Sequence, residues 1–177
     1  MVDSAPRPRR LSQLSAELLD THRDIVKPEW IDHNGHFNMG YYLVVFDCAT
    51  DAFLHQIGLT AELREETGAT TFTLEAHVNY LNELHEGDPL RFTTRLLGFD
   101  HKRIHYFHEM YHATEGYLAA TNELMSLHVN RSTRRSEPIA VEVTRRLRGI
   151  LEAHEALPLP EQVGRRIGLE RRPNNRR

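Results

Sequence analysis

The chain has one cysteine, Cys48, in 177 residues. It therefore cannot form an intramolecular disulfide or a zinc site built from several cysteines of one chain. No apolar run reaches the ~18–20 residues that a membrane-spanning helix requires. No uninterrupted apolar segment follows the early basic residues, which disfavours a secretory signal. Internal repeats are also lacking. We therefore expect a cytoplasmic protein with no membrane partner.

A strong excess of positive charge is also missing, because the formal net charge is −3. Residues 21–144 carry ten lysines and arginines against eighteen acids, whereas residues 145–177 carry nine arginines against four acids. An acidic body argues against nucleic acid as a partner, and a basic end is most often simply solvated. The length suits one folded domain with a substantial core.

The chain divides into three segments by composition and periodicity. Residues 1–20 contain prolines and arginines and then leucines at helical spacing, which predicts a leader with a short helix. Residues 21–140 hold the elements of the main domain. Residues 141–177 contain an amphipathic helix, indicated by Val143, Leu147, Ile150, Leu151 and His154, and then a Pro- and Arg-rich tail that we expect to fray.

A long central helix is the clearest element of the sequence. Asn38 is a favourable N-cap, and Gly58 stands where a glycine would end the helix. Between them most of the helical circumference is apolar, so residues 39–57 predict a helix that is buried nearly all round. Cys48 lies within this helix and is expected to be a small core residue.

The remaining elements are strands. Residues 70–80 alternate with period two, which predicts a half-buried strand with Phe72, Leu74 and Tyr80 on its apolar face. Turn signals separate further strands at residues 90–99, 103–113 and 117–130, and residues 22–31 predict a first strand interrupted by Pro28. The short links predict an antiparallel meander. The expected fold is α+β, with a curved antiparallel sheet around the long helix.

The richest polar cluster directly precedes the helix. A carboxylate, an amide and an imidazole alternate at Asp32, Asn34 and His36, and Gly35 permits a tight turn between them. The free N–H groups of a helix N-terminus stabilise developing negative charge. These groups suit the addition of water to a carbonyl. The same residues also suit a plain turn, because Asp caps turns and Asn-Gly is a common turn dipeptide.

This stretch resembles the hotdog-fold acyl-CoA thioesterases of the 4-hydroxybenzoyl-CoA thioesterase type. Their pattern is a strand, Asp-x-x-Gly, and a Tyr-containing start of the long helix, here Asp32 to Gly35 and then Tyr41 and Tyr42. The Asp-x-Asn-x-His spacing is also similar to that of plant acyl-ACP thioesterases. The resemblance extends to about residue 131. Within the family, residues 34–54 and 77–116 look like the thioesterases of carnitine breakdown, which act on betainyl-CoA.

The resemblance implies a single hotdog domain that hydrolyses an acyl-CoA thioester. Asp32 would act as nucleophile or general base, with Asn34 and His36 as further catalytic residues. The backbone N–H groups of Met39 and Gly40 would polarise the carbonyl. It implies no cofactor and no metal, and a homo-oligomer, either a dimer or a dimer of dimers, with active sites between subunits.

Candidate substrate-binding residues follow from the chemistry of the ligand. Aromatic faces bind a trimethylammonium group, and arginine is the usual partner of CoA phosphates. The aromatic candidates are Trp30, Tyr41, Tyr42, Phe46 and Tyr106, and the arginine candidates are Arg103, Arg131 and Arg134. Core packing is the alternative interpretation of the aromatic residues.

Two other functions remain open. A hotdog enoyl-CoA hydratase or dehydratase also uses an Asp and a His, although usually further apart than Asp32 and His36. A non-catalytic acyl-CoA-binding protein would not need a carboxylate beside the thioester. Four histidines at positions 101, 105, 108 and 112 would share one face of a helix, but their neighbours favour a strand that separates them, so we expect no metal site there.

Overall fold

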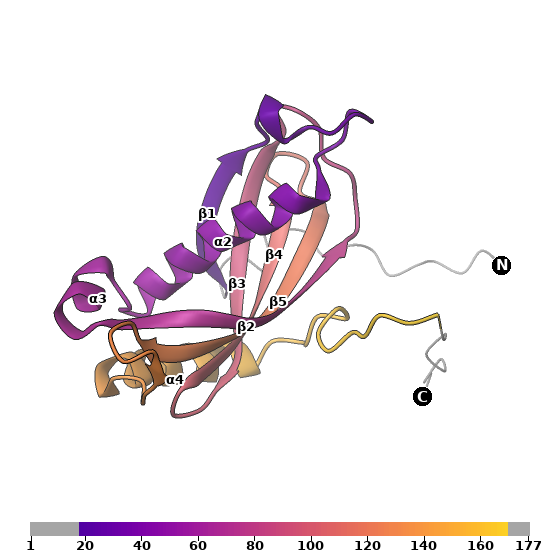
Figure 1. Ribbon diagram of the computed structural model, residues 1–177. Coiled ribbons are helices and arrows are strands. Elements are labelled where there is room, and N and C mark those ends of the chain that lie inside the picture. Colours follow the sequence, from indigo (N-terminus) through magenta and orange to yellow (C-terminus); the bar gives the residue numbers. More distant parts are fainter. Residues whose placement is uncertain (1–17, 170–177) are drawn as a thin grey trace.

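The structure, a computed structural model, describes residues 18–169. A curved antiparallel sheet crosses the molecule, and a long helix, α2, lies along its concave face (Figure 1). The strands run in the order β1-β3-β4-β5-β2, and the short β6 pairs with β5. This is the predicted α+β architecture of a sheet around a central helix. No helix within residues 18–169 is long and apolar enough to cross a membrane.

The bounds of β2 to β5 agree closely with the expected segments, whereas β1 differs and β6 was not predicted. They are β1 (Leu19–Ile25), β2 (Ala69–Tyr80), β3 (Pro89–Phe99), β4 (Arg103–His112), β5 (Leu118–Asn130) and β6 (Arg135–Ser136). The meander holds for β3, β4 and β5, but β2 pairs with β5 rather than with β3. Residues 81–88 are long enough to carry the chain across the sheet.

The first strand is shorter than predicted. It ends at Ile25, and Pro28–Trp30 forms a 3-10 turn instead of continuing the strand. Proline removes a backbone donor and fixes φ, so it suits the first position of such a turn. The edge position of β1 is as expected. The leader helix predicted from Leu11, Leu14 and Leu18 lies almost wholly outside the described residues.

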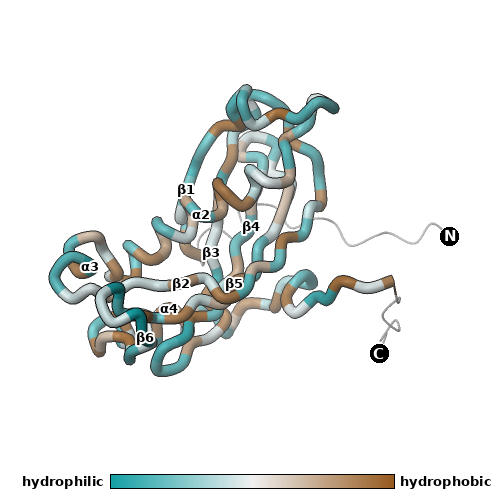
Figure 2. Tube along the Cα trace, viewed as in Figure 1, coloured by the Kyte–Doolittle hydropathy of each residue, from teal (hydrophilic) through white to brown (hydrophobic). Residues whose placement is uncertain are grey.

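Helix α2 (Met39–Gln56) begins and ends within one residue of the predicted bounds. Asn38 caps it as expected, since its side-chain oxygen accepts a hydrogen bond from the Gly40 N–H. Figure 2 shows that hydrophobic residues gather in the first half of this helix. The side chains that face the sheet recur at helical spacing and are buried: Tyr42, Val45, Phe46, Ala49, Thr50, Phe53 and Leu54.

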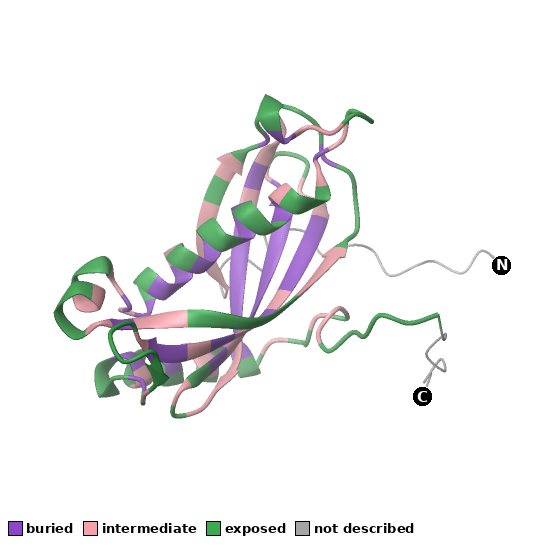
Figure 3. Cartoon of the chain, viewed as in Figure 1, coloured by how far each residue is buried: buried purple, intermediate pink, exposed green. Residues whose placement is uncertain are grey.

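The expectation that α2 is buried all round is wrong for this chain alone. Leu43 and Val44 are 45% and 49% exposed, and Cys48 is exposed rather than in the core. One sheet covers one side of a helix, and nothing in residues 18–169 covers the other. The exposed stripe of α2 lies opposite the sheet (Figure 3).

Strand β2 also leaves its apolar side uncovered. Phe72 and Leu74 are 45% and 56% exposed, and Figure 3 shows the middle of β2 in the exposed colour. A register shift between Thr73 and Glu75 breaks the alternation that the sequence predicted. Strand β2 ends the sheet order, so within residues 18–169 no other strand pairs with its outer edge.

Two short helices complete the fold. Helix α3 (Ala61–Thr67) follows α2, and α4 (Val141–Glu155) packs against β3. The buried Arg95 donates hydrogen bonds to the carbonyls of His154, Leu157 and Pro158, at 2.8, 2.5 and 2.6 Å. The predicted fraying is therefore wrong for the first residues after α4, because Arg95 ties them to the sheet.

Candidate active site

The polar cluster before α2 folds into a tight turn. The Asp32 Oδ1 accepts hydrogen bonds from the Asn34 N–H at 2.8 Å and the His36 N–H at 3.3 Å. The Gly35 N–H donates to the Asp32 carbonyl at 3.0 Å, and Gly35 has φ +82°, which glycine adopts without strain. Asp32 therefore caps the turn, as the simpler interpretation predicted.

The same carboxylate also faces a cavity. The hydrogen bond from the Asn34 N–H is the largest of the effects that hold the pKa of Asp32 below its ordinary 3.8. Both turn bonds use Oδ1, so Oδ2 has no hydrogen bond from a residue in the described range. Asp32 is thus an ionised carboxylate with one oxygen free for chemistry.

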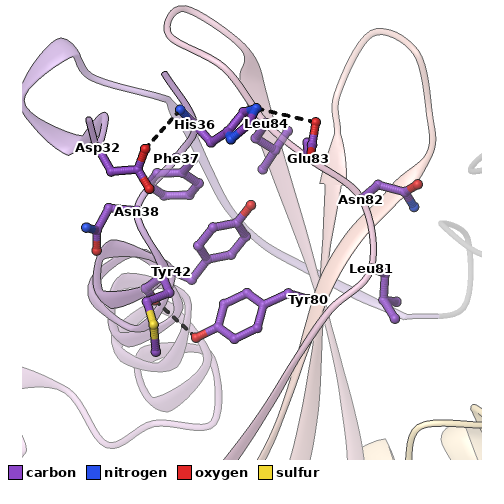
Figure 4. Close-up of a pocket in the computed structure, with 11 residues that line it drawn as sticks. Asp32, His36, Phe37, Asn38, Tyr42, Tyr80, Leu81, Asn82, Glu83 and Leu84 are labelled. Atoms are coloured by element: carbon purple, nitrogen blue, oxygen red, sulfur yellow. Dashed lines mark hydrogen bonds and ion pairs between the residues drawn. The ribbon is translucent and has the colours of Figure 1, made fainter. Parts of the chain in front are cut away.

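The cavity lies between the start of α2 and the segment after β2 (Figure 4). Its volume is about 490 Å³, within the range typical of small-molecule sites. It is lined by Asp32, His36, Phe37, Asn38, Met39, Tyr42, Tyr80, Leu81, Asn82, Glu83 and Leu84. These lining residues include two acids and no lysine or arginine. The cavity is therefore acidic and partly aromatic.

Two tyrosines form an aromatic corner in this cavity. The rings of Tyr42 and Tyr80 lie edge to face, with centroids 5.0 Å apart and planes at 89°. Burial is the main effect that raises the pKa of Tyr42 to about 12, so its hydroxyl stays protonated. The Tyr80 hydroxyl donates to the Met39 carbonyl at 3.1 Å, which ties the end of β2 to the first residue of α2.

The two predicted backbone donors differ in availability. The Gly40 N–H is already bonded to the Asn38 side chain at 2.9 Å. The Met39 N–H has no acceptor anywhere in residues 18–169, and Met39 lines the cavity. An unsatisfied N–H at a helix start is a ready site for a developing oxyanion. The geometry favours Met39 over Gly40 in that role.

Several predicted site residues lie elsewhere. Asn34 is exposed and does not line the cavity, so it reaches Asp32 through its backbone only. Trp30 and Phe46 are core residues, 7% and 0% exposed. Trp30 stacks on Tyr41, and the Lys27 ammonium lies 4.5 Å from the Trp30 ring centroid. Tyr106 is also fully buried. Trp30, Phe46 and Tyr106 are therefore packed in the core, whereas Tyr41 is partly buried and does not line the cavity.

The predicted CoA-phosphate arginines lie far from the cavity of the same chain. Arg131 follows the end of β5 that pairs with Ala69, whereas the cavity lies by Tyr80. At ~3.3 Å per residue the two ends of β2 are ~36 Å apart. Arg131 pairs with Glu65, Arg134 follows in the same turn, and Arg103 pairs with Asp100.

Sequence reasoning missed the segment after β2. The sequence predicted Tyr80 as part of the alternating strand, but no neighbouring residue indicated that this end of the strand lies beside the start of α2. Glu83 reaches the cavity from the same segment, with its Oε2 3.6 Å from the His36 Nε2 (Figure 4). The Phe37 N–H donates to the Leu84 carbonyl at 3.0 Å, which joins the two segments.

Comparison with known proteins agrees with this architecture. Residues 26–166 match the thioesterase-like superfamily. The chain belongs to this superfamily. It is a thioester hydrolase with the hotdog fold, as the resemblance implied. The match extends well past residue 131, through α4 to residue 166. The betainyl-CoA thioesterase of Pseudomonas aeruginosa PAO1 is 46% identical over 154 residues, which cover 87% of this chain and 97% of that protein.

Other relatives combine this thioesterase-like part with a second activity. An L-carnitine dehydrogenase/betainyl-CoA thioesterase of Rhizobium meliloti is 38% identical, and the match covers 87% of this chain but 30% of that protein. Two solved structures are also similar. A Staphylococcus aureus protein in complex with CoA has a TM-score of 0.80 and 34% identity, with 86% and 96% of the two chains covered. A putative thioesterase of Pseudomonas putida KT2440 has a TM-score of 0.75 and 36% identity, with 87% and 98% covered.

Proposed function

We propose that this thioesterase hydrolyses betainyl-CoA to betaine and CoA. The observation that carries the proposal is the acidic, aromatic cavity beside Asp32. Asp32 and Glu83 line it, and the lining residues include no lysine or arginine. The match to the P. aeruginosa relative that bears this name spans 97% of that protein, which supports the same reaction here.

The substrate explains why such a cavity would be useful. A betainyl group carries a fixed positive charge one methylene away from the thioester carbonyl. A site that holds the carbonyl near Asp32 therefore also holds the trimethylammonium group within a few ångströms of it. The perpendicular rings of Tyr42 and Tyr80 offer aromatic faces to a quaternary ammonium. Glu83 adds a second negative charge at the cavity rim.

The chemistry would begin with attack of the Asp32 Oδ2 on the thioester carbonyl carbon. The carbonyl oxygen becomes an oxyanion, which the Met39 N–H stabilises. Collapse of this intermediate breaks the C–S bond, releases CoA thiolate and leaves a mixed anhydride on Asp32. Water then hydrolyses the anhydride to betaine and the free carboxylate. Of the two protons that this water loses, one converts the thiolate to CoA thiol and the other passes to solvent.

The low pKa of Asp32 favours this covalent route over general-base catalysis. A general base works best when its pKa lies near the working pH, and that of Asp32 is below 3.8. A carboxylate nucleophile needs only to be ionised and to have an oxygen without a hydrogen-bond donor. Within the described residues, the Oδ2 of Asp32 meets both conditions. Incorporation of ¹⁸O from labelled water into Asp32 during turnover would mark the covalent intermediate.

We also propose that the protein is a homodimer built through β2. The open edge of β2 and its exposed Phe72 and Leu74 would pair with a second copy. Leu43 and Val44 of α2 line a groove of about 360 Å³ beside this strand and would be covered by the same contact.

The test is thiol release from two substrates of matched shape. Betainyl-CoA and 3,3-dimethylbutyryl-CoA differ only in the central atom, nitrogen with a charge or neutral carbon. We expect turnover of betainyl-CoA and a clear preference for it over the neutral isostere. A preference for the neutral compound would refute the role of the acidic cavity. Absence of thiol release from any CoA thioester would favour the hydratase or the binding protein.

The matched variants are Asp32→Asn and Asn34→Ala. In Asp32→Asn the new amide keeps an oxygen that can accept both turn hydrogen bonds, so the turn should persist while the charge and nucleophile are lost. We expect a fall in kcat of roughly 10²–10⁴-fold, the range for loss of an acid–base or comparable group. Asn34→Ala should leave kcat nearly unchanged, because the structure uses its backbone only. Equal losses in both variants would contradict this assignment.

A further inference from the structure

Three side chains of metal-ligating type meet at the rim of the cavity. His36, Glu83 and His85 each offer one ligand atom, and these atoms all lie within 4.8 Å of one another. His36 comes from the turn before α2, and the other two come from the segment between β2 and β3. The His36 and His85 rings approach edge to face, with centroids 5.6 Å apart. The hydrolytic chemistry proposed above has no use for His85, which does not line the cavity.

Backbone contacts hold the two segments in register. The Phe37 N–H donates a hydrogen bond to the Leu84 carbonyl at 3.0 Å, which joins the residue after His36 to the residue between Glu83 and His85. Asp88 holds the backbone of His85, because its Oδ2 accepts a hydrogen bond from the His85 backbone N–H at 2.8 Å. The same oxygen lies 3.8 Å from the His85 Nδ1, which adds negative charge beside the cluster.

We propose that His36, Glu83 and His85 form a binding site for Zn²⁺. Two imidazoles and one carboxylate are a donor set that Zn²⁺ accepts, whereas Mg²⁺ and Ca²⁺ prefer oxygen ligands. Three protein ligands leave one tetrahedral position for water or substrate. This site departs from the resemblance, which implies no metal. The β4 histidines weighed in the sequence analysis, such as His105 and His108, do not take part in this cluster.

Occupancy of this site would regulate the reaction. This step rests on the proposed function, because His36 and Glu83 also line the acyl cavity. Bound Zn²⁺ would neutralise Glu83 and add positive charge where the trimethylammonium group would lie. We therefore expect Zn²⁺ to inhibit hydrolysis of betainyl-CoA more strongly than hydrolysis of 3,3-dimethylbutyryl-CoA.

The binding experiment uses the full chain without a polyhistidine tag and titrates Zn²⁺ against a chromogenic chelator. The variants are His85→Gln and, as control, His101→Gln, whose exposed histidine lies outside the cluster. We expect each wild-type chain to compete with the chelator for one Zn²⁺, and the His101→Gln control to bind with the same affinity. In His85→Gln the affinity for Zn²⁺ should fall roughly 10-fold or more, because even the loss of an outer-shell group costs that much. Equal affinity in all three proteins would mean an adventitious ion only and would overturn the site.

The activity experiment separates this inference from the proposed function. Without metal, His85→Gln should hydrolyse betainyl-CoA at the wild-type rate, and it should lose the inhibition by Zn²⁺. Following the loss of the thioester avoids interference from zinc bound to released thiol. Equal inhibition of wild type and His85→Gln would refute regulation through this site. Failure of the proposed function would instead abolish turnover before any metal is added and leave the binding result intact.

Discussion

Replacement of His108 should remove much of the acid sensitivity of this fold. His108 is fully buried beneath α2, where its Nε2 lies 3.0 Å from the Thr50 Oγ1 and its Nδ1 lies 2.7 Å from the Thr94 Oγ1. Burial away from water lowers its pKa from 6.5 to about 3. The folded chain therefore keeps this imidazole neutral at every pH near neutrality.

The size of the effect follows from linkage. Above pH 6.5 the ring is neutral in both the folded and unfolded states, so it adds no pH dependence. Below pH 6.5 the imidazole of His108 becomes protonated in the unfolded chain, whereas in the folded chain it stays neutral until the pH approaches 3. The free energy of unfolding therefore decreases as the pH falls. Between pH 7.5 and pH 5 this protonation stabilises the unfolded state relative to the folded state by about 2 kcal/mol, at 1.36 kcal/mol per pH unit. That is a large fraction of the ~5–15 kcal/mol that stabilises a typical domain.

The assay is urea unfolding of wild type and His108→Gln at pH 7.5 and pH 5.0, at one protein concentration. Glutamine can still donate to and accept from the two threonines but does not titrate. We expect wild type to lose about 2 kcal/mol more than the variant between the two pH values, whatever the stability of each at pH 7.5. Equal losses would show that the folded state takes up the proton at His108, and the argument would fail.

Two further substitutions test the site and the assembly. Tyr80→Phe removes the hydrogen bond to the Met39 carbonyl but keeps the ring. One neutral hydrogen bond contributes about 1 kcal/mol, so this substitution should lower kcat by about fivefold for cationic and neutral substrates alike. An effect confined to KM for betainyl-CoA would instead place the hydroxyl on the substrate. Leu74→Lys adds a charge to the exposed side of β2 and should convert a dimer to monomers in sedimentation velocity. Persistence of the dimer would move the interface away from β2.

The elements that the sequence predicts well are those with local signals. Helix α2 is framed by Asn38, which caps it, and by Gly58, which directly follows its C-cap Ile57. The turn at Asp32 is equally local, because its carboxylate bonds to N–H groups two and four residues ahead. Short-range interactions of this kind can be recognised from spacing alone.

The features that the sequence did not predict depend on distant parts of the chain or, in the proposed dimer, on a second copy. Strand β2 lies beside β5, about fifty residues later in the chain, and this pairing places Tyr80 beside α2. Hydropathy alone predicted that Leu43 and Val44 would be buried, although one sheet covers only one side of their helix. Their hydrophobicity is consistent with burial in a dimer.

The proposed substrate and the proposed metal site draw on the charges of the same acidic cavity. A site that attracts a quaternary ammonium with Asp32 and Glu83 attracts other cations by the same charges, and His36 and His85 add the ligands that make Zn²⁺ a competitor. Glu83→Gln should therefore weaken both the preference for betainyl-CoA and the binding of Zn²⁺, because one carboxylate contributes to both. His85→Gln should weaken only the second. If the two properties did not separate in this way, Glu83 would not be their common source.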